Sequence, residues 1–221
     1  MKKFLKNLKN TKLGIFIIFC LLLILYTFTC AFSYVQAVSA NISNSVFRLH
    51  VIANSDSNED QTLKYKVRDN LLNYMNNICS NCSSKEEAIN LVIKHQEKFK
   101  QIVLETIKNE GYSYNVNIEI GNFEFPTKHY GDISLPAGYY DALRVKIGKS
   151  SGRNWWCVMF PSLCFIDVSS GIVPDESKED LQKTLSNEEY SIISNNSNLG
   201  IKFKFKLLEF FTNSGLITAK N

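Results

Sequence analysis

The chain has 221 residues, of which 45% are hydrophobic, and a formal net charge of +4. This length and composition suffice for one domain with a buried core in addition to a targeting segment. The excess charge belongs to the N-terminus, because residues 1–40 hold five lysines and no acid, and the remainder has 20 basic against 21 acidic residues. The body therefore lacks the basic excess of a nucleic-acid-binding protein, and we expect no nucleic-acid partner.

The N-terminus has the pattern of an export signal. A lysine-rich leader precedes a nearly unbroken apolar run, residues 13–32, and the small residues of VQAVSA follow it. Cleavage after Ala37 or Ala40 would remove residues 1–40 as a signal peptide. The run is also about 20 residues long, enough to anchor the chain in a membrane. Both interpretations stay open here; both put the run in the membrane at least transiently and predict that residues 41–221 are exported.

A half-buried strand is predicted after a short polar linker, residues 41–45. In VFRLHVI, residues 46–52, apolar side chains alternate with Arg48 and His50. The acidic loop ANSDSNED follows this strand. Apolar residues then recur at helical spacing, with Asp60 as the expected cap of the helix.

A second helix, a strand and an irregular connection are predicted next. Ser84 and Glu87 form a capping box, and apolar spacing extends the helix to Gly111. Residues 115–120 alternate between polar and apolar side chains, which predicts a strand. Proline and glycine punctuate residues 123–140, so that we expect an irregular connection there.

The remaining elements complete an α+β prediction. YYDALRVKI, the loop GKSSGRN and the apolar WWCVMF predict a β-hairpin around residues 139–160, with its second strand buried on both faces. The rough order β-α-α-β-β-β indicates a single exported α+β domain over residues 46–168, behind the signal or anchor helix. Residues 169–221 are expected to form a partly flexible tail with a strand or short helix at residues 201–211.

Four cysteines lie in the exported part. Cys157 and Cys164 flank a plausible turn, and export permits disulfides, so they are a candidate pair. Cys79 and Cys82 form a CxxC, for which a structural disulfide, plain thiols, a redox pair and a share in a zinc site all stay open. Only one of the two cysteine pairs has a usual zinc-ligand spacing, and we expect neither a metal nor a cofactor.

Catalytic motifs are not evident in the sequence. A Ser-His-Asp site is conceivable from Ser55, His50 and Asp56, but proximity in sequence does not make a triad. HExxH, P-loop and GxGxxG patterns do not occur. We therefore expect no enzyme and no small-molecule substrate.

Both tryptophans of the chain are adjacent, at Trp155 and Trp156. Neighbouring residues of a strand point to opposite faces of the sheet. One ring therefore belongs to the core, and the other needs a cover or a partner.

Three stretches resemble the stage II sporulation protein R family of endospore-forming bacteria. They are RLHVIANSDSNEDQTLKYKVRD at residues 48–69, FPTKHYGDISLPAGYYDALRVKIG at residues 125–148, and GRNWWCVMFPSLCF at residues 152–165. IKFKFKLLEFF also resembles the end of the family's sequences. The Asn-rich stretch before it and the CxxC have no counterpart in that pattern, so no family role is assigned to them.

The resemblance implies a signalling protein. A family member is made in the forespore and exported into the space between the two sporulation membranes. There it activates a membrane-embedded aspartic protease of the mother cell, which removes the pro-segment of the sigma factor sigma-E. The protein would then act as a ligand without catalytic residues of its own.

The candidate partner-binding residues lie in or beside ANSDS and GRNWW. They are Arg48, His50, Asn54, Asp56, Asp60, Arg153, Asn154, Trp155 and Trp156. Aromatic and arginine side chains suit a protein interface. The alternative is that these loops only hold the turns of the domain together. The second hypothesis is an exported hydrolase of cell-wall material, using His50 with Ser55 and Asp56 or a pair of carboxylates.

Overall fold

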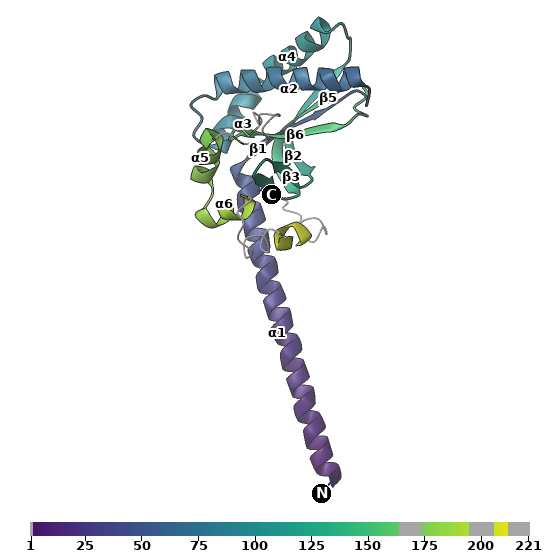
Figure 1. Ribbon diagram of the computed structural model, residues 1–221, viewed down its shortest axis with the longest axis vertical. Helices are drawn as coiled ribbons and strands as arrows, with labels where there is room; N and C mark the ends of the chain where they lie inside the picture. The colour runs from purple at the N-terminus through teal and green to yellow at the C-terminus, as the bar shows by residue number, and fades with distance from the viewer. Residues whose placement is uncertain (1, 164–172, 174, 195–205, 212–221) are drawn as a thin grey trace. The chain divides into compact units, whose positions relative to one another are not determined.

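The computed structural model describes residues 2–163, 173, 175–194 and 206–211. The chain divides into two compact units, Met1–Val38 and Ser39–Asn221. The first unit holds most of one long helix, and the second holds the sheet and the other helices (Figure 1).

Helix α1, Lys2–Ser45, begins the chain. Within its segment Thr11–Ser45, an 18-residue window has a mean hydropathy of 2.7, which suffices for a helix that crosses a membrane and is compatible with either a signal or an anchor. The linker predicted at residues 41–45 is wrong: these residues form the last turn of α1, and Ile42 is fully buried. The helix can continue because no proline or glycine interrupts the residues leading to Ser45.

A four-stranded sheet with the order β2-β5-β1-β6 forms the centre of the second unit. β1 is parallel to β5 and antiparallel to β6, and β2 is antiparallel to β5. A separate two-stranded hairpin, β3-β4, follows β2 in the chain. The strands are β1 (Phe47–Ile52), β2 (Val116–Phe125), β3 (Lys128–Tyr130), β4 (Ile133–Leu135), β5 (Gly138–Ile147) and β6 (Asn154–Phe160).

The predicted hairpin around residues 139–160 is wrong, because β5 and β6 are not paired with each other. β1 lies between them, bonded to both. The connecting loop must cross two inter-strand spacings, roughly 10 Å, which six residues can span easily. The irregular connection predicted over residues 123–140 is also wrong in part, because it contains β3, β4 and the ends of β2 and β5.

β1 is buried on both faces rather than on one, because it is a central strand. Phe47, Leu49 and Val51 face the helices, as their alternation predicts. Arg48 and His50 are also buried, on the other face, beneath aromatic side chains. The sequence pattern predicted which residues share a face of β1, but it did not predict that aromatic side chains cover Arg48 and His50.

Helix α2, Asn58–Ile78, starts two residues before its predicted cap, Asp60. Ser57 is the N-cap, and its hydroxyl accepts a hydrogen bond from the Asp60 N–H at 3.2 Å. The prediction of Asp60 as the cap is therefore wrong. The carboxylate of Asp60 instead accepts hydrogen bonds from Asn54 and Ser55 of the preceding loop.

The second predicted helix is two helices, α3 (Lys85–Lys94) and α4 (Gln96–Asn109). The break falls at His95, whose backbone leaves helical values and whose ring shares a 2.6 Å hydrogen bond with the Tyr74 hydroxyl. Ser84 caps α3 as predicted, although the Glu87 carboxylate accepts from the Ser83 backbone N–H rather than from that of Ser84.

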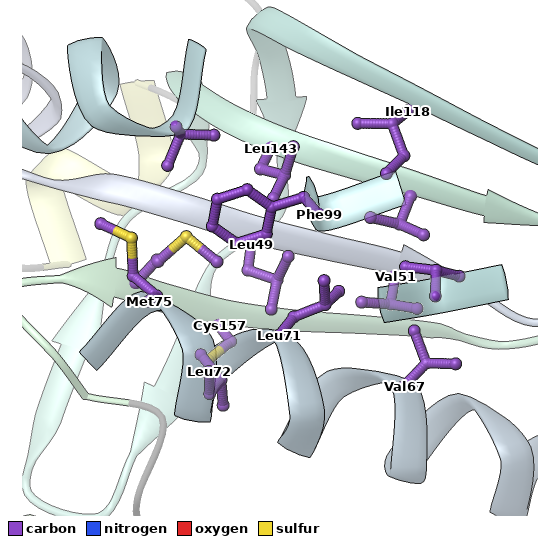
Figure 2. Close-up of a cluster of buried hydrophobic side chains, with 14 of the residues drawn as sticks. Leu49, Val51, Val67, Leu71, Leu72, Met75, Phe99, Ile118, Leu143 and Cys157 are labelled. Atoms are coloured by element: carbon purple, nitrogen blue, oxygen red, sulfur yellow. The ribbon is translucent and has the colours of Figure 1, made fainter. Parts of the chain in front are cut away.

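The core lies between one face of the sheet and the three helices α2, α3 and α4. Figure 2 shows Leu49 and Leu143 of the sheet beside Leu71 of α2 and Phe99 of α4. All four side chains are fully buried. Burial of this kind stabilises a fold by roughly 1.5–3 kcal/mol per large apolar side chain.

Two further helices, α5 (Asp175–Thr184) and α6 (Asn187–Ile193), lie within the stretch predicted as a partly flexible tail. A capping box between Ser186 and Glu189 starts α6. Residues 206–211 are helical, whereas residues 195–205 lie outside the described part. The mixture of a sheet with separate helices confirms the α+β class, with an apolar helix in front.

Candidate partner-binding site

Two loops join at one end of the sheet. We call residues 53–57 and 148–153 together the loop clasp. The N–H groups of Ser151 and Gly152 donate to the carbonyl oxygens of Asn54 and Ala53, at 3.2 and 3.0 Å. The loop between β5 and β6 is thereby fixed to the end of the strand that separates them.

Side chains of the first loop bind backbone groups of the second. Asn54 Oδ1 accepts from the Lys149 N–H at 2.9 Å, and Asp56 Oδ1 accepts from the Arg153 N–H at 2.6 Å. These hydrogen bonds hold the two turns together, which is the role proposed for ANSDS and GRNWW as the alternative to partner binding. It leaves the exposed side chain of Arg153 available for contacts.

Two glycines permit the close approach of the loops. Gly148 has a φ of +56°, and a Cβ added there would overlap the Asn54 side chain. A Cβ added at Gly152 would overlap the Ser55 carbonyl oxygen, which is backbone and cannot move aside.

Asp60 supports the clasp from the first turn of α2. Its Oδ2 accepts from Asn54 Nδ2 at 2.8 Å and from Ser55 Oγ at 2.5 Å. Burial alone raises the pKa of Asp60, but the hydrogen bonds from Ser55 and Asn54 more than offset this, and its pKa is below the ordinary value. Asp60 is thus an ionised, buried anchor of the loop.

His50 lies on the sheet face opposite the core. Its ring stacks on Trp156 with centroids 3.6 Å apart, and its Nε2 shares a 2.9 Å hydrogen bond with Asn154 Oδ1. Burial lowers the pKa of His50 to about 4, against the opposing effect of the Asn154 hydrogen bond. The imidazole is therefore neutral at pH 7.

The hydrogen bonds of the proposed hydrolase residues do not join them. His50 bonds to Asn154, whereas Ser55 donates to Asp60 and Asp56 accepts from a backbone N–H. A triad requires the nucleophile bonded to the base and the base bonded to the acid.

Arg48 is fully buried in an aromatic cage. Its guanidinium carbon lies 4.1 Å from the ring centre of Phe125 and 4.7 Å from that of Tyr140, and Nη2 donates to the Tyr130 hydroxyl at 2.5 Å. Within the described part of the chain, Nε and Nη1 have no hydrogen-bond partner. A buried cation held by aromatic faces without a carboxylate is costly to desolvate.

The two tryptophans point to opposite faces, as expected. Trp156 pairs with His50 of β1 and shares its face, whereas Trp155 pairs with Val51 and packs against the edge of the core. Both rings are half-buried. Trp155 also lies under the guanidinium of Arg68, 4.3 Å from its ring centre.

A pocket of about 490 Å³ opens between α2, β3 and β6. It was not foreseen, but its α2 wall has a signal in the sequence. Gln61, Lys64, Tyr65 and Arg68 follow the spacing i, i+3, i+4, i+7, which places polar and aromatic side chains on one face of a helix. The contributions of β3 and β6 come from residues more than 50 positions away and have no such local signal.

The nine candidate residues differ in access. Arg48 is fully buried, and His50 and Asp60 are about 5% and 4% exposed. The half-buried or exposed members are Asn54, Asp56, Arg153, Asn154, Trp155 and Trp156. Only this second group can meet a partner without rearrangement of the fold.

The cysteines fall into two groups. Cys79 and Cys82 are joined by a disulfide just after α2, which takes both thiols away from a zinc site. Cys157 is buried in β6, but Cys164 lies outside the described residues, so this pairing stays a prediction. Among the described residues, no three His, Cys, Asp or Glu side chains gather as metal ligands.

A family model described as stage II sporulation protein R matches residues 43–170, more than half of the chain. The chain belongs to the stage II sporulation protein R family. A relative, the stage II sporulation protein R of Bacillus subtilis (strain 168), is 38% identical over 144 residues. The match covers 64% of this chain and 64% of the relative's length. No solved structure matches.

Membership in this family supports a role in sporulation. The matched residues include the loop clasp, all nine candidate residues and every described residue that lines the pocket. The candidate site therefore lies inside the part of the chain that defines the family.

Proposed function

We propose that this chain is an exported signalling protein of sporulation. It leaves the forespore and acts in the space between the two membranes. There it activates a membrane-embedded aspartic protease, which then processes the pro-form of sigma-E. The observation that carries the proposal is the family match over residues 43–170, located directly behind a helix suited to a signal or an anchor.

In this proposal the protein is a ligand and performs no turnover. The accessible candidate residues include two tryptophans and an arginine, the side chains that most often carry the binding energy of protein interfaces. His50 offers little to hydrolysis, because a histidine with a pKa of about 4 is a weak base at neutral pH. The hydrolase hypothesis gains no specific observation from the geometry.

Reconstitution in a non-sporulating bacterium tests the proposal. This chain, the membrane protease and the pro-sigma factor are co-expressed, and shortening of the pro-sigma factor is followed on a blot. We expect processing only when this chain is present, and we expect it to persist in His50→Ala. Absence of processing with all three proteins present and this chain exported would refute the activator role.

An export-blocked variant is the matched control. Leu21→Arg with Leu22→Arg interrupts the apolar run without touching the second unit, because two arginines at the centre of a span oppose insertion by about 5 kcal/mol or more. We expect this variant to accumulate in the cytoplasm and to give no processing. The mass of the exported wild type then shows whether residues 1–40 have been removed.

A further inference from the structure

We infer that the pocket between α2, β3 and β6 is the site that receives an acidic segment of the protein partner. This inference rests on the proposed function, because it names the surface through which the protein meets the protease. The pocket has a volume of about 490 Å³, which is large enough for a few side chains of an inserted peptide.

The charge of the pocket is one-sided. Among the described residues that line it, Lys64, Arg68, Lys128 and Arg153 are cationic and none is acidic. Such a cluster of like charges disfavours an empty pocket and favours an anionic occupant.

Two of these cations have carboxylates nearby, but outside the pocket lining. Arg68 contacts Asp69 at 2.7 Å, and Arg153 lies 3.5 Å from Asp56. Both acids are more than half exposed, and surface pairs of this kind contribute only about 0–1 kcal/mol. An incoming carboxylate can therefore replace them at little cost.

Lys64 is the most telling member of the lining. Its side chain is 1% exposed, and its Nζ donates to two neutral oxygens, Gln61 Oε1 at 2.6 Å and the Arg153 carbonyl at 3.1 Å. An ammonium group has three donors, so one makes no hydrogen bond to a described residue, and Nζ also lies 4.8 Å from the centre of the Tyr65 ring. Burial, then Arg153 and Arg68, lower the pKa of Lys64 to about 8, and the charge of Asp56 opposes this only in part.

Arg48 adds positive potential behind the pocket wall. Its guanidinium donates to the hydroxyl of Tyr130, a lining residue, and that hydroxyl donates to the Trp156 carbonyl at 3.3 Å. No carboxylate contacts Arg48 within the described part of the chain. Two buried cations thus lie at one pocket without an acidic partner in its lining.

The other lining residues suit a protein partner. Trp155, Trp156 and Tyr65 add flat amphipathic rings between the cations. Aromatic and arginine side chains together are enriched in protein interfaces.

The tryptophans provide a direct readout. Both tryptophans of the chain line the pocket, so its tryptophan fluorescence reports on this site alone. The full chain in detergent is titrated with overlapping synthetic peptides that cover the parts of the membrane protease facing the intermembrane space. We expect an acidic peptide to change the emission, with an affinity that falls as salt is raised.

Charge reversal tests the lining. Lys128→Glu with Arg153→Glu changes two accessible cations of the pocket, whereas Lys98→Glu with Lys100→Glu makes the same change in net charge on the exposed face of α4. We expect the pocket variant to bind the peptide at least about tenfold more weakly and to lose processing, and the control to keep both. Circular dichroism and thermal unfolding check that both variants fold.

The outcomes separate this inference from the proposed function. Wild-type processing that survives in the pocket variant, or an emission that no peptide changes, overturns the inference and leaves the activator role standing. Muropeptides, inorganic phosphate or phosphatidylglycerol vesicles that change the emission where peptides do not also overturn it. Failure of the wild type to support processing overturns the activator role, and this inference with it.

Discussion

The two faces of the four-stranded sheet come from the same strands but differ in chemistry. On the helix-covered face, β1 contributes Leu49 and Val51 to a continuous apolar core. On the opposite face, the same strand contributes Arg48 and His50, both buried among aromatic rings. Burial is similar on the two faces, whereas the free energy that burial contributes is not.

This difference indicates where stability and function reside. Apolar burial stabilises the fold, whereas a buried guanidinium with unpartnered N–H groups does not. Side chains that break the rule of local consistency are expected at functional sites. The polar face and the adjoining pocket are accordingly the better place to look for partner binding.

The largest loss of stability is expected on the helix-covered face, at Leu49 of β1. Leu49→Ala removes a fully buried side chain from the core and is expected to lower the free energy of unfolding by about 2–5 kcal/mol. Denaturant unfolding of the full chain in detergent, followed by circular dichroism, measures it. A loss under about 1 kcal/mol would mean that this face is not the main source of stability.

The polar face is expected to show a pH effect that the apolar core face lacks. The pKa of His50 is about 4 in the folded protein and near 6.5 when unfolded, so the unfolded state binds more protons between these values. The stability that depends on neutral His50 is fully present above about pH 6.5. It is lost as the pH falls through about 4, by about 3 kcal/mol of unfolding free energy in total. Unfolding at pH 7 and pH 5 is compared between wild type and His50→Gln. An equal pH dependence in both proteins would contradict this assignment.

Arg48→Met provides the test of the cage. The desolvation cost of a buried guanidinium is several kcal/mol, and two cation–π contacts of about 2 kcal/mol each roughly offset it. We expect the free energy of unfolding to change by less than about 2 kcal/mol although the residue is fully buried. A loss as large as that of Leu49→Ala would erase the contrast between the faces.

The smallest effect is expected for Glu119, which lies on the polar face in the edge strand β2. Glu119 Oε1 accepts from Lys146 at 2.8 Å, and the other carboxylate oxygen pairs with Arg144. The hydrogen bond from Lys146 is the main cause that lowers the pKa of Glu119 in the folded protein. The stabilisation by ionised Glu119 is therefore present above the pKa of the unfolded state and is lost as the pH falls through the pKa of the folded state. Glu119→Gln is expected to cost about 0.5–1 kcal/mol at pH 7, and less at low pH.

The matched control for this pair is Glu110→Gln, which breaks a more exposed pair with Lys66. We expect it to change the free energy of unfolding by under about 0.5 kcal/mol at either pH. An equal effect of both substitutions would show that the position on the polar face adds nothing.

The sequence predicted most elements of the fold but not their arrangement. The alternation in VFRLHVI and the capping serine at residue 84 give β1 and the start of α3 correctly, because these are local effects of side-chain period and end-group bonding. The pairing of β5 with β6 was predicted from a short connection, and that prediction failed. Short loops favour hairpins only when no third strand can enter between the two.

The candidate site was predicted in a similar, partial way. Trp155, Trp156 and Arg153 were identified from the sequence, and they line the pocket. Lys64 and Lys128 were not identified. Helical spacing places Lys64 on one face of α2 but does not show that this face lines a pocket, and Lys128 has no local signal. The buried state of Arg48 was also unforeseen, because the rings that cover it come from β2, β3 and β5.

The sequence by itself determined the apolar leader, the face to which each strand residue points, the capped start of α3 and the resemblance to a family. Each of these depends on neighbours in the chain. Only the tertiary structure decided that β1 separates β5 from β6 and that four cations from distant parts of the chain meet two tryptophans at one pocket. Backbone hydrogen-bonding groups are the same in every strand, so they do not specify a partner, and strand order follows from which arrangement buries both faces and satisfies the loops between them.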